Sequence, residues 1–159
     1  MEQQVENNTG WKAMRRIRIL TVALAMLSFS IGGCIYLLWR STTLLMFGWL
    51  KAIGLYDMVL RLRPDDKVDS WLVYSLPDGL WLFAYILLMG VLWRFEPRRS
   101  CMYSAPLVII AIGSELLQIH HIVSGTFDIV DLVCYVMATV LGVAYIKFIN
   151  YFFLNSATL

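Results

Sequence analysis

Long apolar runs alternate with short polar segments along most of the chain. The apolar runs cover residues 19–39, 79–95, 102–122 and 127–148. A helix of about 20 residues crosses the roughly 30 Å of hydrocarbon in a bilayer, so this pattern predicts four transmembrane helices. Trp81 and Trp93 stand near the two ends of the second run, where interfacial aromatic residues are common.

Residues 41–60 are also apolar, but they carry the charged residues Lys51 and Asp57. Charged side chains are costly in the hydrocarbon core of a membrane. We therefore expect this segment to form an amphipathic helix that lies in the membrane interface. The predicted fold is an all-α membrane protein, a bundle of four transmembrane helices plus this interfacial helix.

The composition agrees with a chain that is partly surrounded by lipid. Of the 159 residues, 60% are hydrophobic and 15% are charged, against roughly 25% charged residues in ordinary soluble domains. The net charge of +2 is too small to indicate nucleic acid as a partner. Cys34, Cys101 and Cys134 show no disulfide framework and no CxxC spacing, so we interpret them as small apolar packing residues.

Basic residues predict the orientation in the membrane. Lys12, Arg15, Arg16 and Arg18 precede the first run, a second basic group follows the second run, and no Lys or Arg lies between the third and fourth runs. Cytoplasmic loops carry the excess of Lys and Arg, so both termini are expected in the cytoplasm. Residues 1–18 are then a basic cytoplasmic segment, and residues 19–159 form a single transmembrane domain.

Polar residues gather where this topology places the outer ends of the second, third and fourth runs. Glu115 and Gln118 are three residues apart and share a helix face, as do Asp128 and Asp131. Because only a few residues join the third and fourth runs, these runs should pack as an antiparallel hairpin. We therefore predict an outward-opening polar pocket near the outer leaflet, formed by Asp78, Glu115, Gln118, His121, Asp128 and Asp131.

Each of these polar residues also has a purely structural interpretation. Asp128 is well placed to cap the fourth helix, and Asp78 lies where the second helix starts. Glu115 with Gln118 suits a hydrogen-bonded clasp between helices, and His121 suits a wet interface. Carboxylates and imidazoles also suit divalent ions, but the chain has no HExxH motif and no His triad, so we expect no metal and no other cofactor.

Two short stretches resemble the VanZ-like membrane proteins. They read SELLQ over residues 114–118 and GTFDIVD over residues 125–131, and the resemblance extends over roughly the C-terminal half of the chain. Thr126 stands where the family often has arginine, and Tyr135 stands where it often has asparagine. The resemblance implies a small bacterial inner-membrane protein with a role in the cell envelope, handling a lipid-linked or peptidoglycan-related ligand. No agreed reaction comes with the family.

Three functions remain open at this stage. The favoured hypothesis is an envelope protein that is not an enzyme and whose pocket binds membrane lipid, a lipid-linked cell-wall precursor or a partner protein. The second is an intramembrane enzyme that acts on a lipid-linked substrate, with Asp128 or Glu115 as general base. The third is a small transporter with Glu115 as a protonatable gate, which is disfavoured for four spans without an inverted repeat unless the chain dimerises. Assembly into a homo-oligomer or hetero-oligomer is left open.

Overall fold

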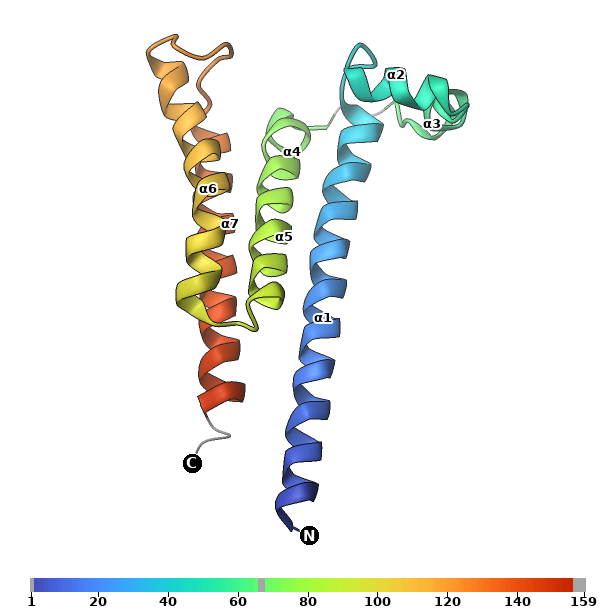
Figure 1. Cartoon of the computed structure of the whole chain (residues 1–159). Coiled ribbons are helices and arrows are strands. Elements are labelled where there is room, and N and C mark those ends of the chain that lie inside the picture. Colours follow the sequence, from blue (N-terminus) through green and yellow to red (C-terminus); the bar gives the residue numbers. More distant parts are fainter. Residues whose placement is uncertain (1, 66–67, 156–159) are drawn as a thin grey trace.

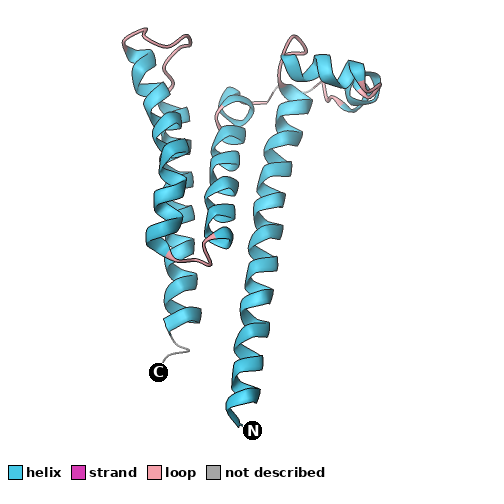
Figure 2. Cartoon of the chain, in the orientation of Figure 1, coloured by secondary structure: helices cyan, strands magenta, loops and turns pink. Residues whose placement is uncertain are grey.

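The computed structural model describes residues 2–65 and 68–155, with side chains described for residues 11–65 and 68–152. Within these ranges the chain is helical and has no strand (Figure 2). The helices are α1 (Glu2–Trp39), α2 (Leu45–Ala52), α3 (Tyr56–Leu62), α4 (Ser70–Tyr74), α5 (Leu76–Leu92), α6 (Pro97–Ile119) and α7 (Ile129–Ile149), followed by a π-helical turn at Asn150–Asn155.

Four stretches of the described chain are long and apolar enough to cross a membrane. They are Trp11–Trp39, Ser70–Leu92, Pro97–Ile119 and Ile129–Phe152. This confirms the predicted all-helical architecture with four helices of membrane-spanning length and hydropathy. The sequence pattern identified them because hydropathy is a local property that does not depend on how the helices pack.

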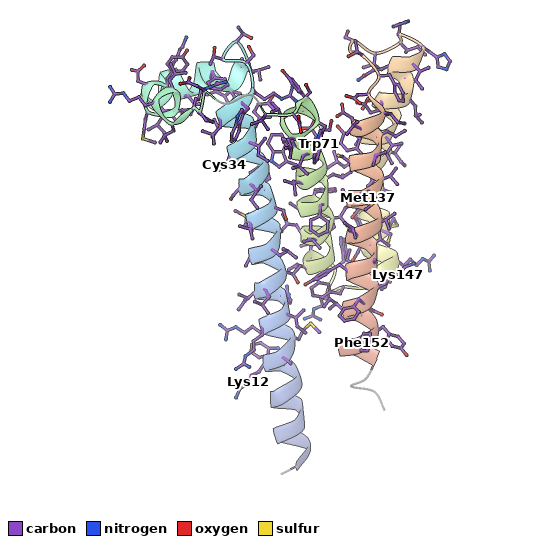
Figure 3. All side chains as sticks on the ribbon, turned by 180° about the vertical axis from the view of Figure 1, so that it is seen from behind. Lys12, Cys34, Trp71, Met137, Lys147 and Phe152 are labelled. Carbon is purple, nitrogen blue, oxygen red and sulfur yellow. The ribbon has the colours of Figure 1, made fainter. Side chains whose placement is uncertain are left out.

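Helix α5 lies at the centre of the arrangement, with α1 on one side and α6 and α7 on the other (Figure 1). The beginning of α1 and the end of α7 lie at one end of the bundle, which we call the terminal end (Figure 1). The α6–α7 loop lies at the opposite end together with α2 and α3, and we call this the α2–α3 end (Figure 1). In the view from behind, Lys12 lies toward the terminal end and Trp71 near the α2–α3 end (Figure 3).

The segment 41–60 folds into two short helices instead of the single helix that was expected. Gly54, with φ of +74°, ends α2. The Leu55 N–H donates to the Leu50 carbonyl at 2.9 Å, which is the bond that closes a Schellman turn. At eight and seven residues, α2 and α3 are far too short to cross a bilayer. Both lie across the axis of α1 (Figure 1), and their place in a membrane interface stays a prediction.

Several other helix boundaries differ from those expected from hydropathy, and the two largest shifts are at the starts of α1 and α6. Helix α1 begins at Glu2, so the basic residues before position 19 continue the first long helix. Helix α6 begins at Pro97, several residues before the apolar run at 102, because Glu96 caps it. The Glu96 carboxylate accepts the backbone N–H groups of Arg98 at 3.1 Å and Arg99 at 3.0 Å. Because this helix start is set by a side-chain cap and not by hydropathy, the polar residues Arg98 and Arg99 can belong to the first turn of α6.

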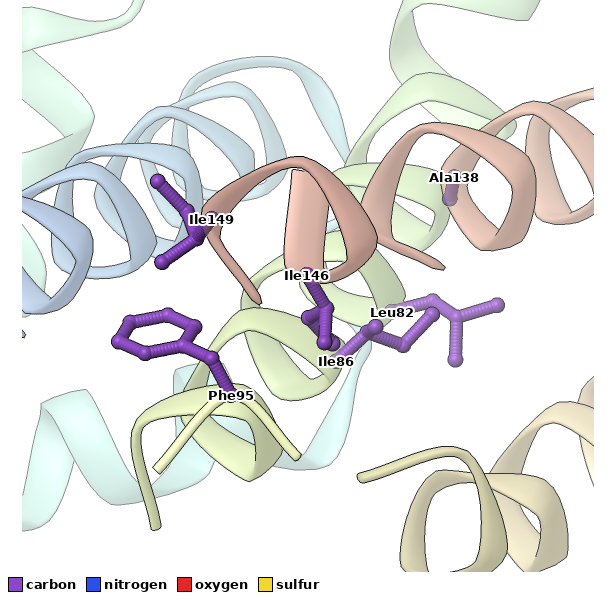
Figure 4. Packing of buried hydrophobic residues seen from close by; sticks show 6 residues of the cluster. All are labelled: Leu82, Ile86, Phe95, Ala138, Ile146 and Ile149. Atoms are coloured by element: carbon purple, nitrogen blue, oxygen red, sulfur yellow. The ribbon is translucent and has the colours of Figure 1, made fainter. Parts of the chain in front are cut away.

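The larger buried cluster lies between α5 and α7 (Figure 4), and a smaller one joins α1 and α5. The larger cluster contains the buried residues Leu82, Ile86, Phe95, Ala138, Ile146 and Ile149. Glycines allow α5 and α7 to approach closely, as is common between membrane helices. A Cβ added at Gly142 would lie 2.7 Å from Ile86 Cγ2, and one added at Gly90 would lie 2.9 Å from Ile146 Cγ1. This close packing sets the position of α5 relative to α7 along the bundle axis, and so determines how their first turns face each other.

Candidate functional site at the α2–α3 end

Asp78 and Asp131 are brought together by the close packing of α5 and α7. Asp78 lies in the first turn of α5 and Asp131 in the first turn of α7. Both are half-buried, and their charges are within electrostatic range of each other. Gly79 makes this possible, because a Cβ there would lie 3.1 Å from the Cys134 Cβ and 3.3 Å from its carbonyl oxygen. Two acids that are far apart in sequence therefore share one place in the bundle.

Glu115 connects the end of α6 to the start of α7. Its side chain is buried, with 5% of the residue exposed. One carboxylate oxygen accepts the backbone N–H of Asp128 at 3.4 Å, a long contact. Its charge also interacts with those of Asp131, Asp128 and Asp78. Glu115 thus connects the two helices. It also belongs, with Asp78, Asp128 and Asp131, to a group of acids that we call the acid cluster.

Asp128 is mainly a helix cap. Its side chain accepts the backbone N–H of Val130 at 2.8 Å, and the residue is exposed. A carboxylate at this position also interacts favourably with the positive end of the helix dipole. The structural interpretation therefore accounts for Asp128 without any ligand.

Gln118 and His121 lie in or beside the α6–α7 loop. A Cβ at Gly125, where φ is +138°, would lie 2.9 Å from the Gln118 amide, so this side chain packs beneath the loop. Helix α6 ends at Ile119, and His121 occupies an exposed turn with φ of +53°. Among the described residues no hydrogen bond or ion pair joins its ring to the acids. Of the six predicted residues, the structure therefore brings the four acids together in the acid cluster. His121 lies outside this cluster.

Arg40 was missed by the sequence reasoning. It follows the last residue of α1, and its guanidinium lies 5.0 Å from the Tyr36 ring centroid and 4.5 Å from that of Tyr74. Its charge is within electrostatic range of Asp78. A usable signal existed, because Arg40 is the only Lys or Arg between residues 19 and 50 and it stands at the end of an apolar run.

Several buried polar atoms at this end have no hydrogen-bond partner in the described part of the chain. They are Trp39 Nε1, Arg40 Nε, Arg63 Nη1, Ser75 Oγ and Asp131 Oδ1. Buried polar groups in proteins almost always have a partner, which can be ordered water or a ligand. Both a cation and a carboxylate are among these atoms, so this end offers donors as well as acceptors to a bound molecule.

An apolar groove runs along α5 and reaches the acid cluster. Its volume is about 690 Å³, and side chains of α1, α5, α6 and α7 line it. Trp81 and Tyr85 in its wall are already engaged, since the Trp81 indole donates to the Phe29 carbonyl at 3.1 Å and the Tyr85 hydroxyl to the Tyr103 carbonyl at 3.0 Å. Asp78 is the single ionisable acid or base of the lining apart from tyrosine hydroxyls, and it joins the groove to the cluster.

Comparison of the chain with family models, with curated proteins and with solved structures found no match. The local geometry also gives no metal centre, because no group of three or more His, Cys, Asp or Glu among the described residues is arranged to hold an ion. What the arrangement offers chemically is an apolar groove lined by Asp78, whose carboxyl lies within electrostatic range of Asp131 and of the Arg40 guanidinium.

Proposed function

We propose that this chain is a multi-pass protein of the bacterial cytoplasmic membrane that binds a lipid-linked, cell-wall-related ligand at the outer leaflet. Four helices of spanning length support a membrane location. The basic residues at the terminal end support cytoplasmic termini, which would place the acid cluster outside. The resemblance of residues 114–118 and 125–131 to VanZ-like proteins supports an envelope role and adds no reaction. We therefore favour binding over catalysis.

The observation that carries this proposal is the double position of Asp78. Its carboxyl belongs to the acid cluster and also lines the apolar groove. A volume of about 690 Å³ lies within the range of ligand pockets, roughly 300–1,000 Å³. An ionisable residue inside a membrane segment is expensive, and such residues usually mark functional sites. An amphiphile fits this arrangement, with its apolar chain in the groove and its head beside Asp78.

The charges near Asp78 favour a particular kind of head group. Carboxylates only accept hydrogen bonds, so Asp78 and Asp131 suit hydroxyl or ammonium donors. The Arg40 Nε has no partner among the described residues and suits a phosphate oxygen. A head that combines phosphate with hydroxyl or amine groups would satisfy both. Lipid-linked sugars of cell-wall synthesis have this chemistry.

The test compares two isosteric substitutions in the purified full-length chain. Asp78→Asn removes the carboxylate that joins groove and cluster, whereas Asp57→Asn removes an exposed carboxylate of α3 near the same end. Binding of a polyprenyl-diphosphate-linked disaccharide in neutral detergent micelles is measured by native mass spectrometry. We expect Asp78→Asn to weaken binding about tenfold, the size of one lost charge-assisted hydrogen bond. Asp57→Asn should leave the affinity unchanged.

A second ligand separates recognition of the head from simple partitioning of the chain. A polyprenyl phosphate without sugar should bind more weakly, and its affinity should depend less on Asp78. Equal affinities of the Asp78→Asn and Asp57→Asn proteins for the disaccharide ligand would contradict the proposal. So would a change in the mass of the ligand during incubation, because this would indicate catalysis.

A further inference from the structure

A second groove lies at the terminal end, far from the acid cluster. One of its walls is a stripe on α1 whose members are spaced three or four residues apart, so they share one helix face. The stripe consists of Trp11, Met14, Arg15, Arg18, Ile19 and Val22. Val91 and Arg94 form the opposite wall, at the end of α5. The enclosed volume is about 710 Å³, and we call this the basic groove.

The lining changes in character along the stripe. The guanidinium-bearing residues Arg15 and Arg18 precede the apolar residues Ile19 and Val22 on α1. Arg94 belongs to the second wall, and none of the described side chains that line the groove is acidic. The cations therefore lie within an apolar surface, with Trp11 and Met14 before Arg15 on the stripe and Ile19 and Val22 after Arg18.

These three arginines are available for a ligand. Among the residues whose side chains are described, no hydrogen bond or ion pair engages the guanidinium groups of Arg15, Arg18 and Arg94. The nearest acid along the chain to Arg94 is Glu96, which already caps α6 and pairs with Arg99 at 3.4 Å. The positive charge of the groove is thus not neutralised by the described part of the protein.

The backbone at Arg94 provides an independent observation. Helix α5 ends in a Schellman turn, in which the Phe95 N–H donates to the Gly90 carbonyl at 2.6 Å and the Arg94 N–H to the Val91 carbonyl at 3.3 Å. Arg94 occupies the left-handed position of this turn, with φ of +54°, where glycine is the usual residue. A side chain here adds strain. An arginine in a position that favours glycine points to a use for its guanidinium.

We propose that the basic groove binds the head group of an anionic phospholipid. The guanidinium of arginine pairs with phosphate through two parallel hydrogen bonds, and basic pockets between membrane helices are suited to anionic lipid heads. The acyl chains continue along Ile19, Val22 and Val91. This site is separate from the groove at Asp78 and requires only that the four long helices span a membrane.

The test uses the full chain in neutral detergent micelles, titrated with dioleoyl-phosphatidylglycerol. Dioleoyl-phosphatidylcholine serves as the neutral lipid and inorganic phosphate as the anion without acyl chains. Thermal stability and lipid retention in native mass spectrometry are measured. We expect phosphatidylglycerol alone to raise Tm and to be retained. Arg94→Gly should weaken its binding about tenfold.

The choice of variants separates binding from folding. Glycine suits the left-handed conformation at position 94, so Arg94→Gly should keep or raise Tm without lipid while lipid binding falls. Arg15→Gln gives a second test from the other wall and should also weaken binding. Arg16→Gln is the matched control, since it removes an equal charge from the next residue of α1, outside the groove lining.

Four outcomes would overturn the proposal. Unchanged phosphatidylglycerol binding by both Arg94→Gly and Arg15→Gln would show that the groove does not hold the lipid. An equal loss of phosphatidylglycerol binding in Arg16→Gln would show that the lipid responds to the overall positive charge of α1 and not to the groove. Equal stabilisation by phosphatidylcholine would show that the anionic head group is not recognised. Equal stabilisation by inorganic phosphate would show that the acyl chains contribute nothing to binding. The Asp78→Asn protein should bind phosphatidylglycerol normally, so a failure here is distinguishable from a failure of the proposed function.

Discussion

The two ends of the bundle carry opposite charges and are built differently. At the α2–α3 end, Asp78 and Asp131 are half-buried and Glu115 is buried. Close contacts at Gly32 and Gly79 press α1 and α7 against α5 there. At the terminal end, an open groove is lined by Arg15, Arg18 and Arg94, whose guanidinium groups have no partner among the described side chains.

This difference shows how a charge is accommodated in each place. A buried carboxyl is costly unless its surroundings are fixed, so its position has to be set by packing and backbone hydrogen bonds before any ligand arrives. A long arginine side chain at an interface can instead extend its charged end toward water and adapt to a ligand. We therefore expect function at the α2–α3 end to depend on packing, and function at the terminal end to depend on charge.

The largest expected effect comes from Gly32, where α1 crosses α5. A Cβ there would lie 2.7 Å from Trp81 Nε1 and 3.1 Å from the Pro77 carbonyl oxygen. Trp81 cannot move away freely, because its indole donates to the Phe29 carbonyl. We expect Gly32→Ala to lower the apparent free energy of unfolding by roughly 1–3 kcal/mol, the usual cost of overpacking. Unfolding in mixed detergent micelles measures this change.

The neighbouring residue is the matched control for this prediction. A Cβ at Gly33 would meet no atom within 4 Å. Gly33→Ala should therefore stabilise the chain by about 0.5–1 kcal/mol, because alanine loses less backbone entropy in a helix than glycine does. If the two substitutions had the same effect, helix propensity rather than packing would govern this end of the bundle.

A smaller effect is expected at Thr21, which holds α1 against α7 nearer the terminal end. Its hydroxyl donates to the Ile17 carbonyl at 2.8 Å, so the Tyr145 hydroxyl, also at 2.8 Å, donates to Thr21. Thr21 is fully buried. Thr21→Val leaves the Tyr145 hydroxyl without this acceptor and should lower the apparent free energy of unfolding by about 1 kcal/mol.

Thr139 provides the control for Thr21. Its hydroxyl donates at 2.8 Å to the Tyr135 carbonyl in its own helix. Thr139→Val removes only this local bond, and we expect a change within about 0.5 kcal/mol. An equal loss in both variants, measured in the same micelles, would show that the bond between α1 and α7 contributes nothing. The terminal half of α1 would then be held by apolar packing alone.

Much of the fold could be predicted from the sequence because it depends on local properties. Apolar runs of sufficient length identified the four long helices. Their ends were less accessible, since the start of α6 depends on capping by Glu96 and the break in residues 41–60 on Gly54. Neither effect changes the hydropathy of the surrounding segment.

The candidate site was less predictable because it depends on how separate helices are rotated and paired. The structure places Glu115 near the start of α7, but the partner of its carboxylate is a backbone N–H of Asp128, which no side-chain pattern reveals. Arg40, just after the end of α1, comes within electrostatic range of Asp78, and Thr126 occupies the position where the resemblance suggested a cation. His121 was predicted to line the polar pocket together with Gln118, but α6 ends between them at Ile119.

The smallest effect is expected at Asp128, an acid of the α2–α3 end that is exposed like the arginines of the terminal end. Asparagine caps helices as well as aspartate does, so Asp128→Asn should change the free energy of unfolding by less than about 0.5 kcal/mol, whereas Asp128→Ala should lower it by about 1 kcal/mol. Binding of the disaccharide ligand should stay within about twofold of the unmodified chain in Asp128→Asn, since this variant keeps the hydrogen bond of the cap. A tenfold loss would mean that the charge of Asp128 contributes to the site despite its exposure. Burial would then no longer distinguish the acids that bind from those that only support the fold.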